Sequence, residues 1–220
     1  VAKDAVVPTI NASNPKLKEL FAHGLSRDAA VDIWITGEAK TWGDVLGTDD
    51  ATPLHAYTRS DACGAAETWA LWFGAKQEDL GGTAVFGDPG VAAAVQKDIY
   101  GIGLNNIGYA YDNDTHLPND GIVVLPIDTD GDGRIAPDEE FYDTKDRLVA
   151  AIAEGKYPSP PARDPYLVTK GVPTDPVAVA FLEYVLGDGQ AKNIPAGYIN
   201  TPENKIRESL ALLESANQSE

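Results

Sequence analysis

Apolar residues along this chain fall into short continuous runs and into longer stretches with helical spacing. A short aliphatic run with no polar alternation predicts a strand that is buried on both faces of a sheet. Such runs place strands at residues 5–10 and 121–127, and further strands are expected at residues 54–58, 107–111 and 166–169.

Apolar residues three and four positions apart predict helices between these strands. Two helices have clear start signals, because Asn14-Pro15 and Ser26 are residue types that cap or open a first turn. The expected helices cover residues 15–22, 27–35, 41–46, 64–73, 91–97, 143–154, 176–186 and 202–213. This alternation of strands and helices indicates an α/β architecture.

The composition excludes several classes of function. The chain has 220 residues, 43% of them apolar, which is enough for a packed core. Its formal net charge of −17 argues against nucleic acid as a partner, because nucleic-acid binding needs a basic surface. No apolar run reaches the ~18 residues typical of a membrane span. The single cysteine, Cys63, excludes an internal disulfide.

The most informative stretch runs from His55 to Trp69 and predicts a short strand, a tight polar turn and the start of a helix. Such a turn directs free backbone N–H groups to one spot at the positive end of the helix dipole, which suits an anion. Arg59, at the end of the strand, adds a planar fork of donors that fits an oxyanion. The stretch therefore predicts an oxyanion pocket.

Two alternatives apply to the same residues. The first is an ordinary capped helix, because Ser and Asp are common before Ala-rich helices. The second is an activated thiolate at Cys63, close to Arg59 and at a helix start. No enzyme is expected, since His23, His55 and His116 are far apart in the sequence and nothing pairs any of them with Cys63.

A second motif lies at residues 128–139, DTDGDGRIAPDE. Its spacing matches the twelve-residue EF-hand loop, which binds Ca²⁺ through oxygens at positions 1, 3, 5, 7 and 12 and has glycine at position 6. The expected ligands are the side chains of Asp128, Asp130, Asp132 and Glu139 and the backbone carbonyl of Arg134. Because a strand is expected before the loop, we predict a structural calcium ion rather than a sensor that opens. An acidic surface loop rich in Asx turns is the alternative.

Several segments then carry a family resemblance through their order along the chain. They are Asp32–Trp42, Thr58–Ala65, Gly87–Ala92 with Ile107–Tyr111, Phe181–Leu186, Gly197–Ile199 and the last helix. In this order they resemble the phosphate-binding proteins of ABC transporters, which are type II periplasmic solute-binding proteins. Thr58–Ala65 stands where that family has an anion loop of Arg, Asp and Ser-Gly-Thr.

The resemblance implies an α/β fold of the type II periplasmic-binding-protein kind, with one complete lobe and the returning half of the other. Residues 1–110 are expected to form the complete lobe with the anion loop, and residues 111–220 the returning half with the EF-hand-like loop. The implied anion-binding residues are Arg59, Ser60, Asp61, Cys63, Gly64 and Ala65. Cys63 and Ala65 depart from the family, because they replace a Ser and a Thr whose hydroxyls hold the anion.

The function implied is delivery of an oxyanion, with phosphate as the first candidate, to an ABC permease from the periplasm or the cell exterior. The family has a further amino-terminal segment before the residues that match Val1, so a second chain or amino-terminal fragment is expected to complete the partial lobe. Attachment to a membrane through a part outside this chain is left open. The alternative is a calcium-stabilised structural or assembly protein that uses the same fold and is completed by another chain.

Overall fold

The computed structural model describes residues 1–217 and divides the chain into two compact units. The core unit is Ala5–Ala162, and the terminal unit joins Val1–Asp4 to the part of the chain from Arg163 onward. The boundaries differ from the expected division at residues 110 and 111, because the segment after Ala110 packs in the core unit as far as Ala162. Residues 218–220, the end of the expected second lobe, lie outside the described part.

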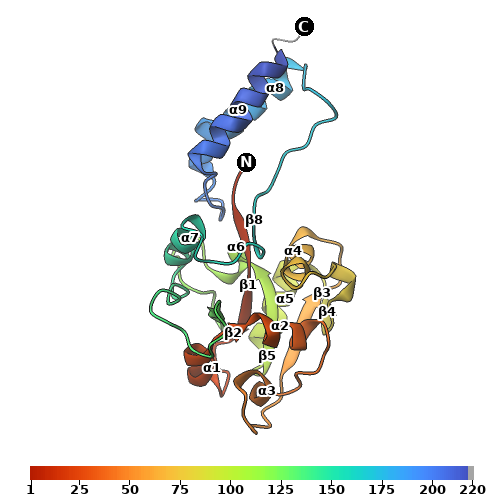
Figure 1. Cartoon of the computed structure of the whole chain (residues 1–220), viewed down its shortest axis with the longest axis vertical. Coiled ribbons are helices and arrows are strands. Elements are labelled where there is room, and N and C mark those ends of the chain that lie inside the picture. Colours follow the sequence, from red (N-terminus) through yellow and green to blue (C-terminus); the bar gives the residue numbers. More distant parts are fainter. Residues whose placement is uncertain (218–220) are drawn as a thin grey trace. The chain divides into compact units, whose positions relative to one another are not determined.

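The core unit alternates helices and strands, as the sequence pattern predicts (Figure 1). Its elements are β1 (Asp4–Asn11), α1 (Leu17–His23), β2 (Leu25–Ser26), α2 (Arg27–Trp34), α3 (Trp42–Leu46), β3 (His55–Arg59), α4 (Gly64–Phe73), η1 (Gln77–Asp79), β4 (Thr83–Val85), α5 (Gly87–Lys97), β5 (Gly101–Asn106), α6 (Ile107–Ala110), β6 (Ile122–Val124), β7 (Ile127–Asp128), α7 (Lys145–Ala153) and β8 (Ala162–Arg163). The helix predicted at residues 64–73 is confirmed with those bounds.

One mixed sheet organises the core unit, with strand order β4-β3-β5-β1-β6 and β8 paired to β1. β3 is parallel to both β4 and β5, whereas β1 is antiparallel to β5 and β6. All eight residues of β1 are buried, the polar residues Asp4, Thr9 and Asn11 as well as the apolar ones. The parallel strands place the starts of α4 and α5 at the same edge of the sheet.

Helices cover both faces of this sheet. On one face α2, α3 and α4 contribute Trp34, Trp42 and Trp69 to the main core, where they meet Ile102 and Leu104 of β5. On the other face α5 packs Val91 and Val95 against Ile122. Gly103 of β5 allows this close packing, because a Cβ there would lie 2.7 Å from Val91 Cγ1 and 2.9 Å from Val95 Cγ2.

The strand predicted at residues 107–111 is wrong, because the strand lies one segment earlier, in β5. Residues 107–110 instead form the short helix α6. Asn106 caps α6 by accepting a hydrogen bond from the Gly108 N–H at 3.0 Å. A cap of this kind ends the extended conformation and begins a helical turn.

The run predicted as one strand at residues 121–127 is divided at Pro126. β6 pairs with β1, and β7 forms a separate two-stranded parallel sheet with β2. The Pro126 carbonyl accepts from the Leu25 N–H at 2.8 Å, at the point where the chain changes from one sheet to the other. A proline has no N–H for a sheet ladder, so it breaks the pairing there.

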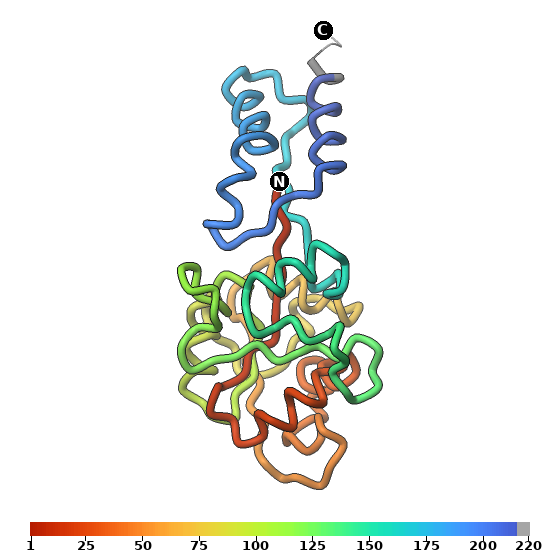
Figure 2. The backbone as a smooth tube through the Cα atoms, turned by 90° about the vertical axis from the view of Figure 1, so that its left-hand side faces the viewer, coloured from red at the N-terminus to blue at the C-terminus, as the bar shows by residue number. Residues whose placement is uncertain are grey.

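The terminal unit contains α8 (Pro176–Leu186), η2 (Asp188–Lys192) and α9 (Glu203–Asn217). α8 and α9 lie side by side (Figure 2), and the helix predicted at residues 176–186 is confirmed. The strand predicted at residues 166–169 is wrong, because this segment pairs with no strand in the described part of the chain.

Candidate anion-binding site

The edge where α4 and α5 begin carries the residues that were predicted to bind an anion. β3 and β4 are parallel, so their carboxyl ends lie side by side and the two helices start next to each other. The first turn of a helix has N–H groups without intrahelical acceptors, and its dipole favours negative charge. The local fold therefore supplies a setting that attracts an anion.

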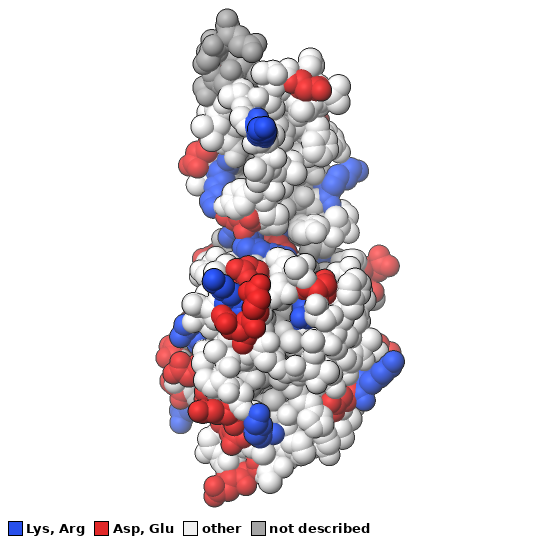
Figure 3. Space-filling model, turned by 90° about the vertical axis from the view of Figure 1, so that its right-hand side faces the viewer, with Lys and Arg blue, Asp and Glu red and all other residues white. Residues whose placement is uncertain are grey.

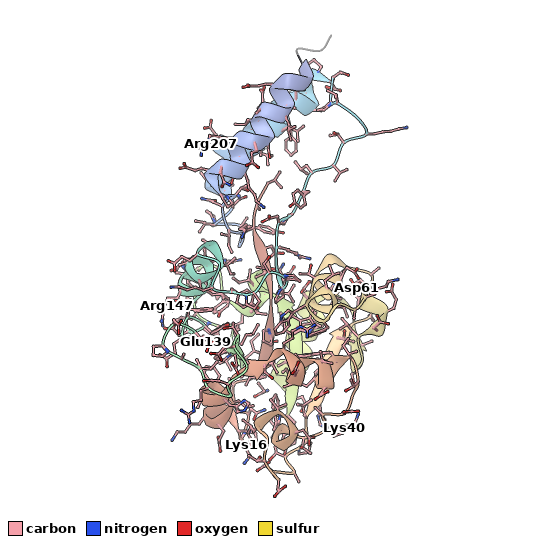
Figure 4. All side chains as sticks on the ribbon, in the orientation of Figure 1. Lys16, Lys40, Asp61, Glu139, Arg147 and Arg207 are labelled. Carbon is pink, nitrogen blue, oxygen red and sulfur yellow. The ribbon has the colours of Figure 1, made fainter. Side chains whose placement is uncertain are left out.

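Arg59, the last residue of β3, is held by two carboxylates. Its Nε and Nη2 donate to Asp61 at 2.9 and 2.5 Å, and its Nη1 donates to Asp88 at 2.5 Å. The Arg59 side chain is only 6% exposed. Figure 4 labels Asp61, which forms an ion pair with Arg59, beside α4. Three of the five N–H groups of the guanidinium thus have acceptors, and two are left for a ligand.

Asp61 links this arginine to the start of α5. Besides the two bonds from Arg59, its Oδ1 accepts from the Gly87 N–H at 3.0 Å. The hydrogen bond from Arg59, followed by that from the Gly87 N–H, holds the pKa of the Asp61 carboxyl well below its usual value. Asp61 therefore stays ionised and fixes the turn against α5.

The lowered pKa of Asp61 predicts that the stability of the folded chain depends on pH in the acid range. Because the pKa of Asp61 is lower in the folded than in the unfolded chain, its contribution is present above the ordinary carboxyl pKa of about 4 and is lost as pH falls below that value. Thermal melts between pH 5 and pH 2 should therefore show a shallower acid dependence for Asp61→Asn than for the parent chain. Identical acid slopes for the two proteins would show that the pair does not stabilise the fold.

The structure places the other predicted residues on the same turn. Gly64 and Ala65 are the first two residues of α4, so their N–H groups have no acceptor within the helix. Ala65 is buried and Gly64 is exposed. Ser60 is exposed, and its backbone N–H donates to the Val85 carbonyl at 2.9 Å.

Cys63 differs from the expectation, because its N–H is already bonded within the chain. It donates to Oε1 of Gln77 at 2.9 Å, while Nε2 of Gln77 donates to the Asp61 carbonyl at 2.6 Å. The Cys63 Sγ accepts from the Ala66 N–H at 3.4 Å and so caps α4. The N–H groups of Gly64 and Ala65 are therefore the ones that can bind an anion. The two hydrogen bonds of Gln77 hold the turn in place.

Sequence reasoning did not include Asp88 and Gln77 in the site. Asp88 follows β4 and reaches Arg59 across 29 residues of sequence, and Gln77 reaches Asp61 across 16. The sequence Gly-Asp-Pro-Gly at residues 87–90 opens α5, and the parallel pairing of β3 with β4 brings it beside Arg59.

The acidic loop at residues 128–139 lies elsewhere in the core unit. In Figure 4 Glu139 and Asp61 are on opposite sides of the central strands. Carboxylate oxygens of Asp128, Asp130 and Glu139 lie within 4.8 Å of one another, so each can reach one cation. Asp128 and Glu139 are buried, with 3% and 7% of their surface exposed. Acidic side chains also form several groups on the face shown in Figure 3, in keeping with the net charge of −17.

Backbone N–H groups hold the carboxylates of this loop. Asp128 accepts from Gly131 and Gly133 at 2.7 and 2.9 Å, and Glu139 accepts from Thr129 and Ala136 at 2.8 and 3.1 Å. Asp132 is not part of the close carboxylate group, and its Oδ1 accepts from the Arg134 N–H at 2.8 Å. The structure thus brings together three of the four predicted carboxylate ligands.

The comparisons with known proteins identify the family. A sequence profile of the PBP superfamily domain matches residues 1–189, and the chain belongs to this superfamily. No curated protein shows significant sequence similarity to the chain. The family confirms the expected fold class, and it supports a binding protein rather than an enzyme.

Three solved structures with the same fold are about equally similar to the chain. A possible phosphate-binding protein from Planctomyces limnophilus aligns with a TM-score of 0.65 and 18% identity, over 98% of this chain and 71% of its own. A putative phosphate ABC transporter substrate-binding protein from Clostridium perfringens, with bound phosphate, has a TM-score of 0.64 and 18% identity over 91% and 70%. An ABC-type phosphate transport receptor from Vibrio cholerae has a TM-score of 0.61 and 17% identity over 91% and 70%.

The family and the similar structures support solute binding. They give no support to the alternative, a structural or assembly protein. Within residues 1–217, no helix is both long enough and apolar enough to cross a membrane.

Proposed function

We propose that this chain is an extracytoplasmic solute-binding protein that binds an oxyanion, most readily phosphate, and delivers it to an ABC transporter. The observation that carries the proposal is the position of Arg59 at the end of β3, just before α4. Two of its guanidinium N–H groups are not bonded to Asp61 or Asp88, and the first N–H groups of α4, those of Gly64 and Ala65, follow on the same turn. The superfamily and the phosphate-binding structures of the same fold support it.

The donors at this site fit a tetrahedral oxyanion. Two guanidinium N–H groups and two backbone N–H groups can bond to separate oxygens, and the dipole of α4 adds favourable potential. The side chains of Cys63 and Ala65 supply no hydroxyl donor, because a thiol donates weakly and a methyl group not at all. We therefore infer that this wall of the site binds phosphate more weakly than a Ser-Gly-Thr loop does.

Isothermal titration calorimetry with phosphate, sulfate and molybdate tests the proposal. We expect saturable heat with phosphate and a matching increase in melting temperature, because a ligand that binds only the folded state stabilises it. The proposal fails if none of the three anions gives heat or a thermal shift.

Restoring the hydroxyls should tighten binding. The double variant Cys63→Ser/Ala65→Thr adds two donors to the turn, and each well-placed hydrogen bond contributes about 0.5–1.5 kcal/mol. We expect a lower Kd for phosphate, by about 5- to 150-fold. The matched control is Ala62→Ser, which adds a hydroxyl at an exposed position of the same loop. Equal affinities for the double variant and the control would contradict the assigned geometry.

We also propose that the loop at residues 128–139 binds Ca²⁺. The ligands would be the carboxylates of Asp128, Asp130, Asp132 and Glu139 and the Arg134 carbonyl. Two of these carboxylates are buried and close together, and a cation offsets the repulsion between them. The loop follows β7, and the Ile135 N–H donates to the Ala22 carbonyl at 3.0 Å. A bound ion would therefore fasten β7 to the end of α1.

A further polypeptide segment is proposed to cover the terminal unit. This unit exposes large apolar side chains, among them Val168, Val177 and Leu212 at 89%, 78% and 72%. Exposed apolar surface on this scale is typical of an interface rather than of a free surface. The solved structures extend beyond the part that aligns, since the chain spans about 70% of their length. We propose that a second chain or an amino-terminal fragment completes this lobe, and that any membrane anchor belongs to that part.

Native mass spectrometry of the protein from its natural source tests this proposal. We expect a second polypeptide in equal amount, and slower hydrogen exchange in α8 when it is present than when it is removed. A lone compact monomer, with no other polypeptide and the same exchange in α8, would contradict it.

A further inference from the structure

Gln77 fastens the turn that leads into α4, residues 61–63, from outside that turn. Its Nε2 donates to the Asp61 carbonyl at 2.6 Å, and its Oε1 accepts from the Cys63 N–H at 2.9 Å. A flipped carboxamide would set Nε2 against an N–H and Oε1 against a carbonyl, so only this orientation forms both bonds. The side chain thus joins two consecutive peptide units of the turn, one through its carbonyl and one through its N–H.

The helix α4 itself holds Gln77 in this position. Gly74, with φ +77°, ends the helix, and the chain then returns to the first turns of α4. There the Glu67 carboxylate accepts from the Gln77 N–H at 3.0 Å. Leu80, three residues further along, packs against the main core. Because the backbone around residue 77 is anchored in this way, its carboxamide keeps its place beside the turn.

The turn needs such a support because its donors to an anion are backbone groups. A peptide unit is planar and rotates only about the bonds on either side of it, and a glycine such as Gly64 restricts that rotation least. If the bonds to the carboxamide were lost, the peptide units before α4 could rotate and change the direction of the N–H groups of Gly64 and Ala65. The backbone of Asp61 would loosen as well, and the side chain of Asp61 holds Arg59.

We infer that Gln77 is a positioning residue of the anion site, which sets the affinity for phosphate through the turn and not by contact with the ligand. The inference rests on the proposed oxyanion function. Gln77 orders the turn before the anion arrives, so binding does not include the cost of ordering it. Ordering the backbone of a single residue corresponds to about a 5- to 30-fold change in an equilibrium constant. We expect a loss of affinity of this size when the carboxamide is removed.

Calorimetric titration with phosphate compares the parent chain with Gln77→Met and Gln96→Met. Gln77→Met keeps the length of the side chain and removes both hydrogen bonds, so its Kd should rise about 5- to 30-fold. Gln96, exposed near the end of α5, also donates through Nε2 to a backbone carbonyl, that of Asp120 at 2.8 Å. Gln96→Met therefore loses a bond of the same kind elsewhere, and its Kd should stay within about twofold of the parent value.

The backbone amide signals distinguish positioning from a general loss of stability. In Gln77→Met the ¹H and ¹⁵N signals of Gly64 and Ala65 should differ from those of the parent chain before phosphate is added. At saturation with phosphate they should reach the same positions as in the parent chain, because the donors are the same. Signals that already coincide without phosphate would show that the turn keeps its shape without Gln77, and would overturn the inference.

The outcomes separate this inference from the function on which it rests. If the parent chain binds phosphate and Gln77→Met has the same Kd, the role of Gln77 is overturned and the proposed function stays intact. No binding of phosphate by the parent chain overturns both. If Gln77→Met melts at a much lower temperature, Gln77→Asn provides the second variant. Its carboxamide is one methylene too short to keep both bonds, so its Kd should also rise at least about fivefold, and an unchanged Kd would overturn the inference.

Discussion

Replacing Arg59 with alanine should remove most of the phosphate affinity of this protein, raising Kd by about 10- to 150-fold. The range corresponds to the loss of a charged hydrogen bond, about 1.5–3 kcal/mol. Arg59 forms ion pairs with both Asp61 and Asp88, so the variant also leaves two carboxylates facing the anion without this positive partner. Calorimetric titration with phosphate measures the change.

Two further variants show whether the lost affinity is due to the guanidinium group of Arg59 or only to its charge. Arg59→Lys keeps the charge but loses the planar fork that holds Asp61, so its affinity should lie between those of the parent chain and Arg59→Ala. Lys97→Ala removes an equal charge from an exposed position at the end of α5 and should leave the affinity unchanged. Parent-like binding by Arg59→Ala, in a protein that is shown to be folded by its melting curve, would place the anion elsewhere.

Calcium should raise the melting temperature of this protein by about 5–10 °C. A ligand at a hundredfold excess over its Kd stabilises the folded state by about 2.7 kcal/mol, and in a domain of this size each kcal/mol shifts the melting temperature by about 2–4 °C. The physical cause is the close approach of Asp128, Asp130 and Glu139, which repel one another without a cation. Melting curves in excess calcium and in excess chelator measure the difference.

Substitutions in the loop locate this effect. In Glu139→Gln the closing ligand loses its charge, so most of the shift should disappear. Asp114→Asn removes a carboxylate from another exposed loop and should keep the full shift. A melting temperature that is the same in calcium and in chelator, with no metal found by elemental analysis, would show that the loop is an acidic surface turn.

The local part of the anion site could be predicted from the sequence, because a strand, a turn and a helix start are written in consecutive residues. Arg59, Gly64 and Ala65 lie where that pattern places them. The two residues that complete the site could not be predicted in this way. Asp88 and Gln77 reach the turn through tertiary contacts that depend on which strands are neighbours.

The two strands that were predicted wrongly failed for a common reason. Apolar runs at residues 107–111 and 166–169 have the composition of strands, but a strand also needs a partner to pair with. The sheet takes β5 instead, where Gly103 admits α5 at close range. Packing of this kind between distant segments is not visible in a local pattern.

A titration with phosphate, followed through the backbone amide signals of the protein in solution, shows whether the turn before α4 holds the anion. We expect the ¹H and ¹⁵N signals of Gly64 and Ala65 to shift with saturation, and the Cys63 amide to shift least of the three because it remains bonded to Gln77. If phosphate saturates the protein while the signals of Gly64 and Ala65 do not move, the anion does not bind at this turn.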